Sequence, residues 1–242
     1  VNVGSGAYDP MHGGKLQNIV SFIPGKDSQG VPVYAYSTVG EGNTTKLYFT
    51  QDFQTWASFT SYDVSVTGID SAPTCLEFGQ NGKFFLGTVS GKLYEISVGE
   101  NGIPTAYALL ETVSGSPKID SVIYGDHSNQ WIFSYEGKIN TVEIGGGAIV
   151  QRLSLPAGAK CVDIAEGPNG VAMILKKENN SLEPMLAFNN WTSIVGPAGM
   201  TIDVASLNPT EFNHSEHLGK WATADAAGTT VLTTSDLLSW IT

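Results

Sequence analysis

Aspartates at corresponding places along the chain are the first residues that could carry chemistry. Asp120, Asp163 and Asp203 each fall in a short β-rich run, within IDSVIY, CVDIA and IDVAS respectively. Hydrolysis of a glycosidic bond uses two carboxylates, about 5 to 9 Å apart, on either side of the bond. These three aspartates are therefore the candidate catalytic set if the chain is an enzyme. The alternative is that they face solvent, where they stay hydrated or share a cation such as Ca²⁺.

Histidine and cysteine give weaker candidate sites. His214 and His217 flank a glutamate and could bind a metal, but no third spaced ligand follows, so a polar loop is the simpler interpretation. Cys75 and Cys161 fall on β-rich runs that are predicted not to be neighbours. A disulfide needs Cα atoms within about 7 Å, so two buried free thiols are predicted. These patterns predict no cofactor.

Three aromatic residues lie in predicted loops, Tyr8, Tyr62 and Phe212. Exposed aromatic rings can stack on sugar rings, so these are the candidate ligand-binding residues. The alternative is ordinary exposure, or packing between neighbouring structural units.

A repeat along the chain indicates the elements that must position these side chains. An apolar residue opens a short β-rich run after a turn-like segment, five times, at spacings of 46, 46, 47 and 46 residues. The five residues are Leu47, Leu93, Ile139, Leu186 and Leu232. Five units at this nearly constant interval fill the chain.

Each unit contains four short strand-like runs separated by turns. Asn81-Gly82 and Asn169-Gly170 stand between the first two runs of their units, and Asn-Gly is a strong hairpin signal. Four strands in a unit of about 45 residues are typical of a β-propeller blade. The sequence therefore predicts an all-β fold, a five-bladed β-propeller with about four antiparallel strands per blade. The first strand of each blade is expected to line a central channel.

The predicted boundaries follow from the repeat. Residues 1–16 form an N-terminal arm, and residues 17–242 form a single propeller domain. The blades are expected at about 17–60, 72–113, 118–156, 159–196 and 200–242.

A turn motif recurs near the end of three units. Asp precedes Trp by four positions in Asp52–Trp56 and again in Asp236–Trp240, and a shorter relative is Asn190-Trp191. The carboxylate is expected to accept backbone N–H bonds within the hairpin, and the Trp ring to pack between blades.

These turns resemble the Asp-box repeat of sialidase-like propellers, which implies a structural role at the periphery. The match departs from that pattern, because the glycine position holds Gln54 or Leu238 and the Asp-to-Trp spacing is one residue shorter. Sialidases bind their substrate carboxylate with a set of arginines, whereas this chain has only Arg152, which argues against that activity. Blade number and length are also similar to tachylectin-type lectins and to arabinanase-like and invertase-like glycosidases.

Composition limits the function classes. The formal net charge is -11, from 23 acidic and 12 basic residues, which argues against nucleic-acid binding. No apolar segment is long enough to span a membrane, and the first residues do not resemble a signal peptide. Charged residues make up only 14% of the chain, so neutral polar side chains must cover its surface, in the style of bacteriophage virion proteins.

The sequence therefore predicts a non-enzymatic binding or structural propeller. A bacteriophage virion component, in capsid decoration or host attachment, is the favoured role, with other virion proteins or a cell-surface glycan as partners and a virion or extracellular location. The alternatives are a free carbohydrate-binding lectin and a five-bladed glycoside hydrolase.

Overall fold

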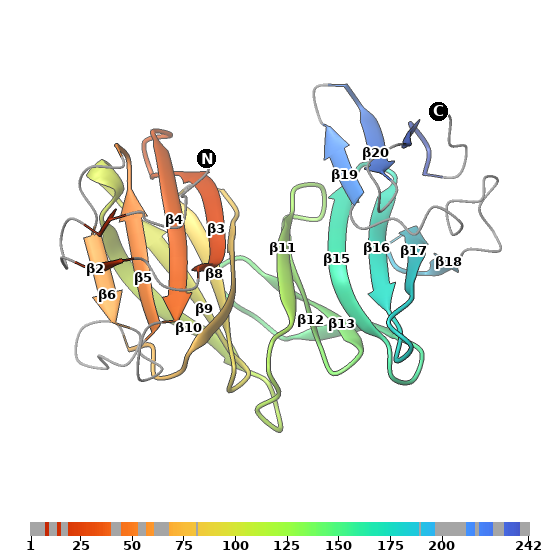
Figure 1. The fold of residues 1–242 in the computed structure, drawn as a ribbon, viewed down its shortest axis with the longest axis horizontal. Coiled ribbons are helices and arrows are strands. Elements are labelled where there is room, and N and C mark those ends of the chain that lie inside the picture. The colour runs from red at the N-terminus through yellow and green to blue at the C-terminus, as the bar shows by residue number, and fades with distance from the viewer. Residues whose placement is uncertain are drawn as a thin grey trace. The chain divides into compact units, whose positions relative to one another are not determined.

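The computed structural model describes most of the chain. The described residues are 8–9, 14–15, 19–39, 45–52, 57–60, 68–80, 82–188, 190–196, 212–215, 218–224 and 230–237. They form five sheets in chain order, each a meander of consecutive strands, four in the first four sheets and three in the fifth (Figure 1).

The strands have the following bounds. The first sheet contains β3 (Ile19–Lys26), β4 (Pro32–Val39), β5 (Thr45–Thr50) and β6 (Ala57–Thr60), and the second contains β7 (Pro73–Phe78), β8 (Lys83–Thr88), β9 (Lys92–Val98) and β10 (Pro104–Thr112). The third contains β11 (Ser121–Gly125), β12 (Gln130–Tyr135), β13 (Lys138–Glu143) and β14 (Val150–Ser154). The fourth contains β15 (Lys160–Gly167), β16 (Gly170–Lys176), β17 (Leu182–Phe188) and β18 (Ser193–Val195). The fifth contains β19 (Phe212–Ser215), β20 (Lys220–Ala224) and β21 (Val231–Thr234).

Two further strands, β1 (Tyr8–Asp9) and β2 (Gly14–Lys15), pair with each other in the N-terminal segment. The described residues contain one short 3₁₀ helix, η2 (Glu100–Gly102), which joins β9 to β10. No helix within the described ranges is long and apolar enough to cross a membrane.

The repeat coincides with the third strand of every sheet. All five apolar residues that mark it lie on these strands, and each is at most 1% exposed. Side chains alternate between the two faces of a strand, and each of these residues lies on a buried face of its third strand. The five sheets are the blades of a five-bladed β-propeller, and the predicted all-β fold class is confirmed.

Internal contacts divide the chain into two compact units. The first contains residues 1–122 and 145–147, and the second contains residues 123–144 and 148–242. In the first unit, the first and second sheets share one core, where the Phe84 ring lies 5.5 Å from that of Phe49 and 5.0 Å from that of Phe78. In the second unit, one core lies between the third and fourth sheets and another between the fourth and fifth.

The predicted Asn169-Gly170 hairpin is shifted by one residue. Gly167 pairs with Gly170, so the loop is Pro168-Asn169. The proline ring holds φ near -65°, which excludes the type I′ turn that Asn-Gly favours. Gly170 instead begins β16, with φ +155°, and a side chain there would clash with the carbonyl oxygen of Ala187.

The recurring turn motif has the same local bonding in two sheets. The Thr50 hydroxyl donates to Asp52 Oδ1 at 3.1 Å, and the Thr234 hydroxyl donates to Asp236 Oδ1 at 2.8 Å. Each hydroxyl also accepts the backbone N–H of its aspartate. The threonine two residues earlier is thus one donor to each carboxylate, and the backbone N–H donors stay a prediction. Trp56 and Trp240 lie outside the described residues.

Candidate functional site

Two of the three predicted catalytic aspartates, Asp120 and Asp163, lie among the described residues. Asp163 lies on β15, and its Oδ2 accepts the backbone N–H of Phe212 at 2.7 Å, which links the fourth sheet to the fifth. Asp120 is half-buried just before β11 and belongs to the first compact unit, whereas Asp163 belongs to the second. Asp203 lies outside the described residues. The described residues contain no group of three or more His, Cys, Asp or Glu that could hold a metal, so the suggested Ca²⁺ stays a prediction.

The candidate histidines are described only in part. His214 is half-buried on β19, with its ring 4.9 Å from the Trp221 ring and 6.1 Å from the His127 ring. His217 lies outside the described residues. The Trp221 and His127 rings and the backbone of Gly167 thus lie beside His214, and metal binding by this residue stays a prediction.

Phe212 corrects the prediction of exposed aromatic residues. It begins β19 instead of lying in a loop, and it is 2% exposed. Its side chain belongs to the core between the fourth and fifth sheets, together with Ile174 and Trp221. A buried ring offers no face to a ligand. Tyr8 contributes backbone to β1, and Tyr62 lies outside the described residues.

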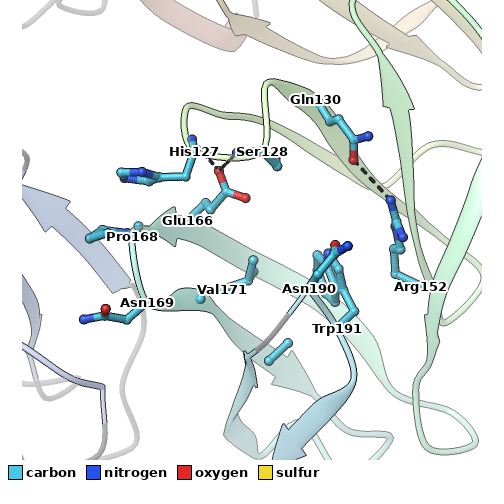
Figure 2. Close-up of a pocket in the computed structure, with 13 residues that line it drawn as sticks. His127, Ser128, Gln130, Arg152, Glu166, Pro168, Asn169, Val171, Asn190 and Trp191 are labelled. Atoms are coloured by element: carbon cyan, nitrogen blue, oxygen red, sulfur yellow. Dashed lines mark hydrogen bonds between the residues drawn. The ribbon is translucent and has the colours of Figure 1, made fainter.

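The candidate site is a cavity of about 430 Å³ in the second unit, between the third and fourth sheets (Figure 2). It is bounded by the β11–β12 loop, by β14, by the β15–β16 hairpin and by the β17–β18 turn. The residues that line it are His127, Ser128, Gln130, Arg152, Glu166, Gly167, Pro168, Asn169, Gly170, Val171, Ala187, Asn190 and Trp191.

Glu166 forms one side of this pocket. It lies near the end of β15, and its Oε2 accepts the backbone N–H of His127 at 3.0 Å and of Ser128 at 3.2 Å. These bonds hold the β11–β12 loop against the fourth sheet. The other carboxylate oxygen, Oε1, accepts no hydrogen bond from the described residues, so it can accept one from a ligand. Burial, together with the nearby Asp126 and Glu166 carboxylates, raises the pKa of Tyr124 beside this loop.

Arg152 forms another side, and Figure 2 shows it apart from Glu166. It projects from β14 across the third sheet, where Nε donates to Thr141 Oγ1 at 2.9 Å and Nη2 donates to Gln130 Oε1 at 3.3 Å. Both partners are neutral. The ion pairs seen among the described residues all use lysine, and none involves Arg152.

The β17–β18 turn brings an aromatic ring and an amide to the pocket. Asn190 and Trp191 have φ of +53° and +69°. Asparagine tolerates the left-handed region, whereas a bulky residue there is a conformational outlier. Trp191 is half-buried and packs against the core between the third and fourth sheets. The turn motif therefore located these two residues, but their pocket-lining position was not predicted.

This arrangement combines several kinds of polar group around one cavity. Arg152 and the side-chain amides can donate hydrogen bonds, Glu166 can accept them, and Trp191 supplies apolar surface. Glu166 is the only carboxylate among the described lining residues, so a two-carboxylate hydrolytic site is not assembled from them. Sequence reasoning missed Arg152 and Glu166 as partners in one site. The available signal was that Arg152 is the only arginine of the chain.

Comparison with known proteins identifies the fold and no family. No family model matches the chain, and no curated protein matches it. Among solved structures, the chain is similar to the extracellular domain of a protein assigned as a one-component system from B. thetaiotaomicron, with a TM-score of 0.57 and 14% identity over 84% of the chain. The chain spans 26% of the length of that protein chain.

Two further solved structures show the same kind of likeness. TolB from Acinetobacter baumannii has a TM-score of 0.54 and 14% identity, with 93% of this chain and 53% of TolB covered. A chain of a nidogen/laminin complex has a TM-score of 0.51 and 9% identity. The match covers 80% of this chain and 71% of that one. At these identities the likeness concerns the fold, and it gives no support to the Asp-box or tachylectin resemblance in particular.

Proposed function

We propose that this chain is a non-enzymatic binding propeller whose pocket between the third and fourth sheets binds a sugar. The observation that carries this proposal is the position of Trp191. A bulky residue held at φ +69° costs conformational free energy, and such outliers cluster at functional sites. Here the outlier lines a cavity that is otherwise rich in polar groups.

The chemistry of the lining supports a sugar over a purely apolar ligand. A sugar ring presents hydroxyls that both donate and accept hydrogen bonds, together with a flatter apolar face. Glu166 Oε1 and the amides of Asn169 and Asn190 match the hydroxyls, and the Trp191 ring matches the apolar face. The cavity of about 430 Å³ lies within the range of about 300 to 1,000 Å³ found for small-molecule sites.

The biological setting belongs to the same proposal. An acidic chain with few charged side chains suits an extracellular or virion surface, and one of the similar solved structures is an extracellular domain. We therefore favour a cell-surface glycan as the partner. A bacteriophage virion component that recognises a host and a free lectin would both use such a site.

The test is a glycan-array screen of the purified protein with two variants. Trp191→Ala removes the ring from the pocket. Tyr135→Ala is the matched control, because Tyr135 is a half-buried aromatic residue at the end of β12, in the neighbouring third sheet, and does not line the pocket. We expect glycans bound by the wild type to lose about tenfold or more in affinity, about 1.4 kcal/mol, with Trp191→Ala only.

Two results would overturn the proposal. The first is an array with no bound glycan, and the second is binding that both variants retain equally. Mass analysis of the bound glycans tests the non-enzymatic part, since cleaved products would show catalysis.

A further inference from the structure

We infer that the sugar bound by this pocket carries a carboxylate, and that Arg152 is the residue that binds it. This inference rests on the proposed function and adds the charge class of the ligand. It predicts a preference for a uronic acid over the corresponding neutral sugar.

The partners of Arg152 are the first argument. The chain has 12 basic residues and a single arginine, and that arginine lines the pocket. Its two hydrogen bonds go to a hydroxyl and an amide oxygen, so no carboxylate neutralises it within the described part of the chain. A half-buried guanidinium with neutral partners gains more from an incoming carboxylate than one that is already paired.

The orientation of the guanidinium is the second argument. Thr141 fixes Nε and Gln130 fixes Nη2, so the plane of the group is set by β13 and β12 before a ligand arrives. Guanidinium has five N–H donors in all. Nη1 donates to none of the described residues, and Nη2 has a second N–H. These N–H groups remain as donors for a planar acceptor such as a carboxylate. Such pre-orientation reduces the entropy that binding costs.

Glu166 gives the pocket a direction. Its Oε1 can accept a hydrogen bond from a sugar hydroxyl, but its negative charge repels an anion. A ligand carboxylate is therefore favoured beside Arg152, and ligand hydroxyls are favoured beside Glu166. The net charge of -11 disfavours general attraction of anions by this protein. A preference for an acidic sugar would therefore come from this local site.

The experiment measures three matched ligands by isothermal titration calorimetry. They are methyl glucuronide, methyl glucoside and methyl glucosaminide, which are acidic, neutral and cationic forms of one ring. We expect the wild type to bind the glucuronide about tenfold more tightly than the glucoside, with a preference that weakens as salt is raised.

Three variants locate the cause. Arg152→Gln should bring the glucuronide and glucoside affinities together. Arg152→Lys keeps the charge but loses the planar fork, and should retain part of the preference. Lys160→Gln removes an exposed positive charge of β15 outside the pocket, and should leave the preference unchanged.

The outcomes separate the two proposals. Equal binding of glucuronide and glucoside, or tighter binding of glucosaminide, overturns the inference and leaves sugar binding standing. A glucuronide preference that survives Arg152→Gln also overturns it. If none of the three ligands binds and the glycan array is silent, the proposed function fails, and the inference fails with it. If Arg152→Gln does not fold, the wild-type ratio, its salt dependence and the lysine variant decide.

Discussion

The junction between the first and second sheets and the junction between the third and fourth sheets arise from the same repeat but are filled differently. In the first, a Cβ placed on Gly25 would lie 2.6 Å from the Phe84 ring and would also clash with Phe78. In the second, a Cβ placed on Gly125 would lie 2.6 Å from Glu166 Oε2. Both glycines permit a close approach, but one approach is to aromatic rings and the other to a carboxylate.

The polar groups at the two junctions also differ in how fully they are used. Beside the first junction a smaller cavity of about 310 Å³ includes Asp27 in its lining. Asp27 Oδ1 accepts hydrogen bonds from the backbone N–H groups of Gln29 and Val31, and Asp27 Oδ2 accepts one from Gln51 Nε2. The chain thus satisfies Asp27 by itself, whereas Glu166 and Arg152 keep atoms available. The proposed function thus assigns recognition to the second junction, whereas the first junction is filled by aromatic packing.

Replacing Phe84 with alanine should have the largest effect. The ring is fully buried, and its removal leaves a cavity in the core of the first unit, so we expect a loss of about 3 to 5 kcal/mol in the free energy of unfolding. Urea denaturation followed by circular dichroism measures it. Leu109→Ala on β10 is the control, since Leu109 is 51% exposed and should change stability by less than about 0.5 kcal/mol. A loss below about 1 kcal/mol for Phe84→Ala would contradict a packed junction.

Gly25→Ala should have the next effect. The new methyl group overlaps Phe78 and Phe84, and overpacking of this kind costs about 1 to 3 kcal/mol. Thermal and urea unfolding of the variant measure this cost. Gly196→Ala is the matched control because a Cβ there meets no atom within 4 Å. Equal stability of the two variants would show that the close approach at Gly25 is not needed.

Glu166→Gln should separate recognition from stability at the second junction. The amide oxygen can still accept the N–H groups of His127 and Ser128, so we expect a stability change of about 1 kcal/mol or less. Sugar affinity should fall several-fold, since the NH2 group that then takes the place of Oε1 donates hydrogen bonds and cannot accept one from a sugar hydroxyl. Calorimetric titration beside urea unfolding measures both. A large loss of stability with unchanged affinity would reverse the roles given to the two junctions.

Lowering the pH should have the smallest effect on stability, through the Lys92–Asp70 ion pair. This lysine has a carboxylate partner, whereas the partners of Arg152 are neutral. Lys92 in the first unit donates to Asp70, and this hydrogen bond lowers the pKa of Asp70 below its usual 3.8. A lowered folded-state pKa gives stability that is present above the unfolded pKa and is lost as pH falls through the folded value. Because Asp70 is 40% exposed, we expect under about 1 kcal/mol. The stability difference between wild type and Asp70→Asn should shrink between pH 5 and pH 2 (roughly the window of an aspartate); a constant difference would contradict it.

The sequence predicted the parts of the fold that depend on local periodicity. Leu47, Leu93 and Ile139 stand at equal intervals because each lies near the start of the third strand of a blade, and all three are fully buried. The predictions also held for Cys75 and Cys161, which are buried free thiols; burial raises the pKa of Cys75 to about 12.

Sequence reasoning failed where distant segments decide the environment. Phe212 was expected in a loop, but pairing of β19 with β20 and packing against the fourth sheet bury it. Arg152 and Glu166 are too far apart in the sequence for any spacing rule to associate them. Their shared pocket depends on how β14 and the β15–β16 hairpin approach each other.

The sequence by itself determined the number of blades, the third strands and the all-β class, because these follow from hydrophobic period and turn spacing within some 46 residues. The tertiary structure alone decided which polar residues share a cavity, and which carboxylates the chain itself satisfies. The physical reason is that hydrophobic periodicity is a local property of the chain, whereas the state of a buried polar group depends on every segment that surrounds it.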